Sequence, residues 1–195
     1  MRLAIFDFDG TITHRDGFIP FMFFTHGIFK TIFKSVLVSP VLLLYVIKIL
    51  PNWKAKEMVF ACFYKEWPEA KFNQLASEYA LKLLPLIVRT SASARLQWHK
   101  EHGHKIVIVS ASFENYLEVW CRKEGFDCIA TKIEIRDQKL TGKFASPNCY
   151  GEEKIRRIKE KYQLNDFEYI YAYGDSRGDL PLKTIANEFQ YKPFR

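Results

Sequence analysis

The sequence predicts an α/β fold, with a Rossmann-like parallel sheet that has helices on both faces. Three short apolar runs, at residues 3–6, 106–109 and 169–173, are typical of strands that are buried on both faces. Segments with a helical pattern separate them, and strands that alternate with helices favour a parallel sheet. In such sheets ligands bind at the carboxyl ends of the strands, so we expect a functional site at that edge.

Other segments complete the core. Helices are expected at residues 89–102, 113–124 and 152–162. The first two would end at Gly103 and Gly125, since glycine commonly follows the last turn of a helix. Residues 132–144 alternate apolar and polar side chains around a turn, which predicts a β-hairpin.

Residues 17–85 depart from the alternation, because they contain no convincing strand and have a helical pattern throughout. An insertion at this point, directly after the first strand, would lie over the carboxyl edge of the sheet. We therefore expect residues 1–16 and 86–195 to form the catalytic core and residues 17–85 to form an all-helical cap.

The composition limits the classes of function. The chain has 195 residues, 48% of them hydrophobic, so it can bury the core of one domain with an inserted subdomain. Its formal net charge of +7 favours an acidic partner: a phosphorylated metabolite, a nucleic acid or an anionic membrane surface. No nucleic-acid motif is present, and no predicted strand interleaves lysines with aromatic residues, so we expect no nucleic-acid binding.

The cysteines and the N-terminus indicate a cytoplasmic protein. The four cysteines form no C-x-x-C pair and have no histidine at zinc spacing, which argues against a zinc site and favours reduced thiols. A signal peptide is not expected, because its cleavage would remove the first strand and the aspartate that follows it.

Carboxylates gather at two of the strand ends. Asp7 and Asp9 follow the first run, and side chains at positions i and i+2 of an extended segment point the same way. Asp175 and Asp179 follow the last run. Four carboxylates in one crevice repel one another unless a cation binds. An all-oxygen site with room for water and phosphate favours Mg²⁺.

Four segments resemble the sequence motifs of the haloacid dehalogenase (HAD) superfamily. They are Asp7-Phe8-Asp9-Gly10-Thr11 after the first strand, Ser110 after the second, Lys154 at the start of a helix and Gly174-Asp175-Ser176-Arg177-Gly178-Asp179 after the last strand. All four occur in order and frame nearly the whole chain. The resemblance implies a phosphomonoester hydrolase that forms an aspartyl-phosphate intermediate.

The resemblance also implies a role for each matching residue. Asp7 would be the nucleophile, and Asp9 would protonate the leaving group and then activate water. Ser110 and Lys154 would bind phosphate oxygens, and a helix starting near Ser112 would point its N–H groups at the same anion. The remaining assignments are Mg²⁺ ligation by Asp7, the Asp9 carbonyl and Asp175, orientation of metal-bound water or Lys154 by Asp179, and substrate contacts at Thr11, Asp16, Ala111 and Ser112.

The position of the cap, between the first two motifs, resembles subfamily IB, which contains phosphoserine phosphatase. Two departures from that enzyme are Gly178, where it has Asn, and Ser-Ala-Ser at residues 110–112, where it has Ser-Gly-Gly. Asp16 falls at an acidic substrate contact of phosphoserine phosphatase, so it is either a contact to a substrate amine or a solvated turn residue. Residues 179–182 and 190–193 are more similar to phosphatidylglycerophosphatase C, which dephosphorylates a lipid head group.

The predicted cap is both basic and apolar. Residues 17–56 contain five lysines and no acidic residue. Within them, the uncharged runs 17–29 and 35–47 are each shorter than the roughly 20 residues that a spanning helix needs. Joining the runs would place Lys30 and Lys34 in the membrane, which is costly, so we expect no spanning helix.

Residues 36–49 are apolar on all sides, which predicts burial, although a small cap has little interior. Three interpretations stay open: membrane contact, dimerisation through the cap and ordinary packing. We expect a protein peripheral on the inner membrane face, with Lys30, Lys34 and Lys48 around the mouth of the site and a substrate such as phosphatidylglycerophosphate. The alternatives are a soluble phosphatase of a phosphoserine-like metabolite and, more remotely, a non-enzymatic basic binding protein.

Overall fold

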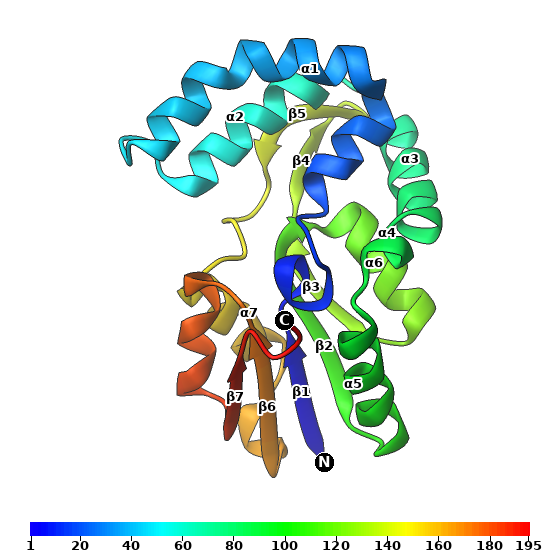
Figure 1. The fold of residues 1–195 in the computed structure, drawn as a ribbon, viewed down its shortest axis with the longest axis vertical. Coiled ribbons are helices and arrows are strands. Elements are labelled where there is room, and N and C mark those ends of the chain that lie inside the picture. Colours follow the sequence, from blue (N-terminus) through cyan, green and yellow to red (C-terminus); the bar gives the residue numbers. More distant parts are fainter.

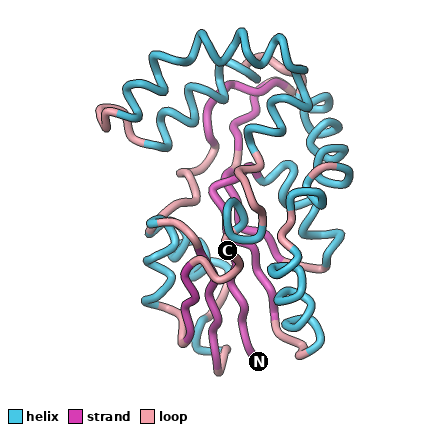
Figure 2. The backbone as a smooth tube through the Cα atoms, in the orientation of Figure 1, coloured by secondary structure: helices cyan, strands magenta, loops and turns pink.

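Five parallel strands form the central sheet of the computed structural model, which describes all residues, 1–195. Their order is β3-β2-β1-β6-β7, and helices lie on both sides of the sheet (Figure 1, Figure 2). The strands are β1 (Arg2–Phe6), β2 (Lys105–Phe113), β3 (Asp127–Thr131), β6 (Tyr169–Gly174) and β7 (Glu188–Tyr191). The predicted parallel α/β fold is confirmed, and β3 and β7, which were not predicted, complete its two edges.

The central strand is β1, and the residue pairing aligns it with β2 on one side and β6 on the other. Phe6 at its carboxyl end is paired with Ile108 of β2 and with Tyr173 of β6. Parallel pairing therefore brings Asp7, together with the residues that follow Ile108 and Tyr173, to one edge of the sheet.

Alternate residues of β1 enter two hydrophobic cores. The helices that cover the sheet are α5 (Thr90–Glu101), α6 (Glu114–Glu124) and α7 (Glu152–Lys161), and the short helical turns are η1 (Phe8–Ile12), η2 (Leu164–Asp166) and η3 (Arg177–Thr184). Ala4 and Phe6 pack with residues of α5 and α6, whereas Leu3 and Ile5 pack with residues of α7. Helices on both faces thus explain the unbroken apolar run. All three covering helices lie within one residue of their predicted bounds.

Residues 17–85 form helices and loops. The helices are α1 (Phe18–Val46), α2 (Asn52–Tyr64), α3 (Glu69–Lys82) and α4 (Leu84–Ile87). α1 and α2 lie side by side above the carboxyl edge of the sheet (Figure 1). The division into a core and a cap at residues 17 and 85 stays a prediction.

The two uncharged runs of the predicted cap belong to one helix, although they were treated as separate segments. α1 is 29 residues long, is kinked at Gly27, whose φ of 73° lies in the left-handed region, and continues through Pro40. By length and composition α1 is able to cross a membrane, as are many core helices of soluble proteins and signal sequences. Only 11% of its most apolar window is buried, although Phe18, Phe21 and Met22 near its start belong to the hydrophobic core.

Val38 is the only buried residue among residues 36–49, so of the three interpretations left open for this segment, ordinary packing within the cap is not supported. α1 packs on its neighbours along one side, so a helix that is apolar all round leaves its other sides exposed. We call the following side chains the exposed face of α1: Ile28, Phe29, Ile32, Phe33, Val36, Leu37, Leu43 and Val46.

The predicted hairpin is confirmed as β4 (Ile133–Arg136) and β5 (Lys139–Phe144). Asp137 and Gln138 at its turn have φ values of 48° and 60°, as a two-residue hairpin turn requires. The hairpin packs on α2 instead of joining the central sheet, and a Cβ at Gly142 would lie 2.9 Å from the Cβ of Ala61. The hairpin, which was assigned to the predicted catalytic core, therefore packs among the helices of residues 17–85.

Candidate active site

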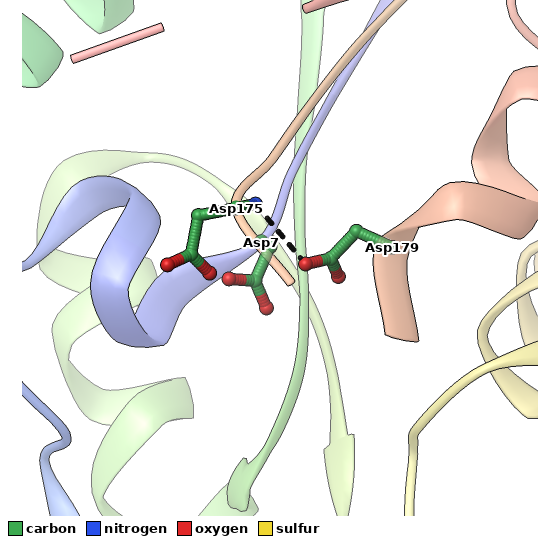
Figure 3. Close-up of side chains that lie close together, drawn as sticks. All are labelled: Asp7, Asp175 and Asp179. Carbon is green, nitrogen blue, oxygen red and sulfur yellow. Dashed lines mark hydrogen bonds between the residues drawn. The ribbon is translucent and has the colours of Figure 1, made fainter. Parts of the chain in front are cut away.

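The carboxyl edge of the sheet gathers three aspartates from two segments. Asp7 follows β1, and Asp175 and Asp179 follow β6; their carboxyl groups lie side by side (Figure 3). Gly10 makes this approach possible, because its φ is +82° and a Cβ there would lie 2.5 Å from an oxygen of Asp175. The glycine of the first motif is thus required by both backbone conformation and space.

Lys154, in the first turn of α7, lies between two of these carboxylates. Its Nζ donates to Asp7 Oδ1 and to Asp179 Oδ1, each at 2.6 Å, and the lysine side chain is 2% exposed. Burial alone would lower the pKa of Lys154, but the two carboxylates outweigh it and hold the pKa above its ordinary value. The lysine therefore stays protonated within this buried group.

The two carboxylates beside Lys154 respond differently to burial. Burial raises the pKa of Asp7 to about 7, and the charge of Lys154 offsets only part of that rise. Burial also acts to raise the pKa of Asp179, but Lys154 and donors from Ser176 outweigh it and leave the pKa lowered. The backbone N–H and hydroxyl of Ser176 donate to Asp179 Oδ2 at 2.9 and 2.7 Å. Asp179 thus orients Lys154.

Hydroxyl and amide groups hold the second aspartate of the first motif. Asp9 Oδ1 accepts from the backbone N–H of Gly17 at 2.7 Å, and its Oδ2 accepts from Ser112 at 2.5 Å and from Ser110 at 3.3 Å. Burial, with a smaller contribution from the charge of Asp16, raises the pKa of Asp9 to about 6. Asp9 therefore connects the end of β2 to the start of α1.

The strand before Ser110 is longer than predicted. It was expected to end at Val109, but β2 continues to Phe113 with an irregular register, and α6 then begins at Glu114, close to its predicted start. The strand rather than a helix end thus turns the hydroxyls of Ser110 and Ser112 toward Asp9.

A cavity of about 450 Å³ opens beside Asp7. Its polar wall includes Asp9, Lys154 and Ser110. It continues along α1 as far as Tyr45, so the site has a polar and an apolar end.

The four predicted substrate contacts divide into two pairs. Asp16 and Ala111 line the cavity. Asp16 also accepts from the backbone N–H of Phe18 at 2.7 Å, at the start of α1. Thr11 and Ser112 do not line the cavity; Thr11 donates to Asp7 Oδ2 at 2.9 Å, and Ser112 donates to Asp9. The latter two hold the aspartates in place.

Lys56 and Tyr150 are among the cavity residues that were not predicted as site residues. Lys56 of α2 donates to the carbonyl of Ala111 at 2.8 Å, and burial lowers its pKa. The ring of Tyr150 lies where a side chain at position 178 would be, since a Cβ on Gly178 would be 2.2 Å from it. Glycine at position 178, in place of the asparagine of phosphoserine phosphatase, was a sequence signal for a bulky neighbour. Nothing in the sequence distinguished Lys56 from the other lysines of residues 17–85.

The carboxylates fit a hard cation. One oxygen from each of Asp7, Asp175 and Asp179 lies within 4.8 Å of the others, and an all-oxygen donor set suits Mg²⁺. Arg195 forms an ion pair with Asp175. Burial raises the pKa of Asp175, and Arg195 counters only part of that rise. When all three aspartates are ionised, their charges against those of Lys154 and Arg195 leave a net charge of −1, so a cation is electrostatically favoured here.

Comparison with known families and proteins gives one consistent match. The family described as haloacid dehalogenase-like hydrolase matches residues 4–183. Protein CicA of Caulobacter vibrioides is 31% identical over 195 residues, which are 99% of this chain and 86% of CicA. The probable phosphatase Rv3661 of Mycobacterium tuberculosis is 32% identical over 133 residues, 66% of this chain, and the match spans about half (46%) of that protein's length.

Solved structures share the fold at low sequence identity. A protein of unknown function from Bordetella pertussis Tohama I has a TM-score of 0.82 at 22% identity, over 96% of this chain and 88% of that one. A phosphoserine phosphatase solved as a phospho-aspartyl intermediate analogue has a TM-score of 0.61 at 22% identity, over 96% and 84% of the two chains.

Proposed function

Because this chain belongs to the haloacid dehalogenase-like hydrolase family, we propose that it is a Mg²⁺-dependent phosphomonoester hydrolase with an aspartyl-phosphate intermediate on Asp7. The similarity to a probable phosphatase supports this proposal. The observation that carries the proposal is the position of Asp7. Its carboxylate lies on the cavity wall, 2.6 Å from Lys154 and beside Asp175 and Asp179.

In the first step, an oxygen of Asp7 attacks phosphorus, and the bond from phosphorus to the leaving oxygen breaks. Asp9 donates a proton to that oxygen; a pKa of about 6 leaves part of Asp9 protonated near neutral pH. Lys154 offsets the negative charge on the phosphoryl oxygens, and Ser110 donates to one of them. Thr11 holds the other oxygen of Asp7, which limits rotation of the nucleophile.

In the second step, Asp9 takes a proton from a water molecule, which attacks phosphorus and releases Asp7 and inorganic phosphate. Mg²⁺, when held by Asp7, the Asp9 carbonyl and Asp175, supplies positive charge to the phosphoryl oxygens. Asp179 keeps Lys154 in place. The phospho-aspartyl analogue of phosphoserine phosphatase, which shares this fold, supports such an intermediate.

For the substrate we propose a phosphate on a lipid head group, such as phosphatidylglycerophosphate, with residues 17–85 as a cap that rests peripherally on the inner membrane face. The exposed face of α1 supports this proposal, together with the exposed lysines Lys30 and Lys48. Lys34 is not a free cation at the site mouth, because its Nζ donates to the carbonyls of Cys62 and Phe63 at 3.0 Å. Two lysines rather than three therefore remain for attraction to anionic lipid.

A second candidate is a small zwitterionic phosphomonoester similar to phosphoserine. It is favoured by Asp16 and Lys56, which line the same cavity and are suited to bind an amine and a carboxylate. A non-enzymatic binding role is less well supported, because it leaves the Asp7–Lys154–Asp179 group without a use.

A substrate panel with metal controls tests these proposals. Phosphate release is measured from lipid phosphates in mixed micelles and from small phosphomonoesters, each with chelator, Mg²⁺ or Ca²⁺. We expect activity with Mg²⁺, none with chelator and little with Ca²⁺, whose larger and looser shell holds the attacking oxygen poorly. Full activity in chelator excludes the metal proposal, and turnover of small phosphomonoesters alone favours the second candidate.

A further inference from the structure

The cavity beside Asp7 has two ends of opposite chemistry. Near the carboxylates, charged and hydroxyl groups form its walls. Farther away it runs between α1 and α2 along apolar side chains. We call this part the apolar arm and define it by Met22, Val38, Leu42, Val59 and Phe63.

The walls of the arm are buried, whereas its far end is open. Met22, Val38 and Val59 are 7%, 5% and 8% exposed. At the far end, Leu42 and Tyr45 are 42% and 41% exposed. From residue 31 to residue 45 the helical rise is about 20 Å, so the arm is long enough for an extended chain.

The arm offers few polar partners to a ligand. The hydroxyl of Thr31 donates to the carbonyl of Met22 at 3.2 Å, and the hydroxyl of Tyr45 accepts from Asn52 at 3.2 Å. The Thr31 hydroxyl is thus used within the protein, and the remaining polar groups, the O–H of Tyr45 and the side chains of Ser35 and Asn52, are few beside the apolar wall. An apolar chain loses little by entering such a space, whereas a sugar or peptide would leave its own polar groups unpaired.

We propose that the apolar arm binds an alkyl or isoprenoid chain of the substrate while the phosphate lies at Asp7. The preferred substrates are then amphiphilic phosphomonoesters whose chain leaves the bilayer and lies inside the protein. The mouth at Leu42 and Tyr45 adjoins the exposed face of α1, which gives the chain an apolar path from a membrane. This inference rests on the proposed phosphatase activity at Asp7.

A series of short to long n-alkyl phosphates tests the arm, each used with Mg²⁺ as a monomer below its micelle concentration. We expect kcat/KM to rise by up to roughly fourfold for each methylene that enters the arm, and to level off when the arm is full. Soluble monomers separate binding in the arm from attachment to a membrane.

Leu42→Trp and Leu43→Trp form a matched pair on adjacent positions of α1. Leu42 lines the arm, whereas Leu43 is 61% exposed and does not line it. Leu42→Trp obstructs the mouth, so the ratio of kcat/KM for long to short chains should fall by about tenfold. Leu43→Trp should leave that ratio unchanged.

The outcomes separate this inference from the function on which it rests. Turnover that is independent of chain length, or equal effects of the two tryptophan variants, overturns the arm while the phosphatase assignment stands. Absence of turnover for every phosphomonoester in the presence of Mg²⁺ overturns the phosphatase proposal instead.

Discussion

The carboxyl edge of the sheet and helix α1 differ in whether their side chains have interaction partners within the chain. At the edge, Asp7, Lys154 and Asp179 are buried ions that bond to one another, and no buried side-chain polar atom of the chain lacks a hydrogen-bond partner. α1 has no acidic residue and exposes large apolar side chains, including Phe29 at 89%. The polar side chains of the edge therefore find hydrogen-bond partners within the chain, whereas the exposed apolar side chains of α1 have no packing partner in it.

This difference has a physical cause. A buried charge costs several kcal/mol unless it is paired, so each buried charged residue at the edge requires a partner of opposite charge nearby. An exposed apolar side chain has no such requirement, so it does not identify what covers it. A membrane, a second chain or a substrate would each do so. Substitutions at the edge should therefore have large effects on chemistry and stability, and substitutions on the exposed face of α1 should act mainly on association.

The largest effect is expected at the nucleophile. Asp7→Asn should lower turnover by more than about a hundredfold, since the amide oxygen attacks phosphorus poorly. The fold should remain for two reasons. An amide oxygen can also accept the hydrogen bond from Thr11, and Lys154 keeps its ion pair with Asp179. Phosphate release and a circular dichroism spectrum check this result. Turnover above about a hundredth of the original rate would exclude Asp7 as the nucleophile.

The next effect concerns the buried ion pairs. Lys154→Met leaves the carboxylates of Asp7 and Asp179 without their shared cation, so the free energy of unfolding should fall by about 3 kcal/mol. The matched control is Lys159→Met, an exposed position on the same helix, which should change it by less than about 0.5 kcal/mol. Urea unfolding measures both variants. Equal effects would mean that the ion pairs do not stabilise the edge.

The pH dependence of stability isolates Asp7. Its pKa is raised by burial from an ordinary 3.8 to about 7, so the folded state holds a proton that the unfolded state has lost between these values. This contribution to stability is present below the lower value and is lost as the pH rises through the higher one. In chelator, Asp7→Asn should therefore gain stability relative to the original protein across that window. Urea unfolding at pH values below, within and above it should show the gain, and parallel curves would contradict the raised pKa.

On the exposed face of α1 we expect an effect on association alone. Phe29→Glu combined with Phe33→Glu should weaken binding to anionic vesicles by more than about tenfold, because each inserted Phe contributes about 2 kcal/mol. Leu86→Glu, at a position 71% exposed on α4, is the control. Vesicle flotation at low and high salt measures binding, which should weaken with salt.

The same flotation experiment separates the interpretations of α1. A monomer that ignores both zwitterionic and anionic vesicles excludes membrane contact and favours a small soluble substrate. A dimer that the double variant dissociates identifies α1 as a contact between two copies instead.

The smallest effect concerns Arg195. Its ion pair with Asp175 competes with a metal for the same carboxylate, and the arginine side chain is 46% exposed. Exposed pairs are worth at most about 1 kcal/mol, so Arg195→Ala should lower the Mg²⁺ concentration for half-activity by no more than about fivefold. Arg195→Lys keeps the charge and should lie closer to the original value. A higher Mg²⁺ requirement in Arg195→Ala would show that the arginine assists metal binding.

The sequence alone predicted the parallel sheet and the helices that cover it. The run at residues 3–6 is continuous because both faces of β1 are buried, and burial of this kind is visible in the chain itself. The positions of Asp7 and Asp175 directly after strands followed from the same pattern, because parallel strands end at one edge. Ser110 was expected at a strand end as well, but it lies inside β2. Their chemical roles remain predictions.

Only the tertiary structure decided what surrounds that edge. Lys56 meets the carbonyl of Ala111 across 55 residues of chain, and nothing local distinguishes it from Lys30 or Lys48. The apolar run of α1 left packing, membrane contact and dimerisation open, and its exposure depends on how few neighbours the fold provides on that side. Local patterns determine secondary structure and motif geometry because they act over a few residues. The partners of a side chain in the cap depend on contacts between distant segments, which local patterns do not contain.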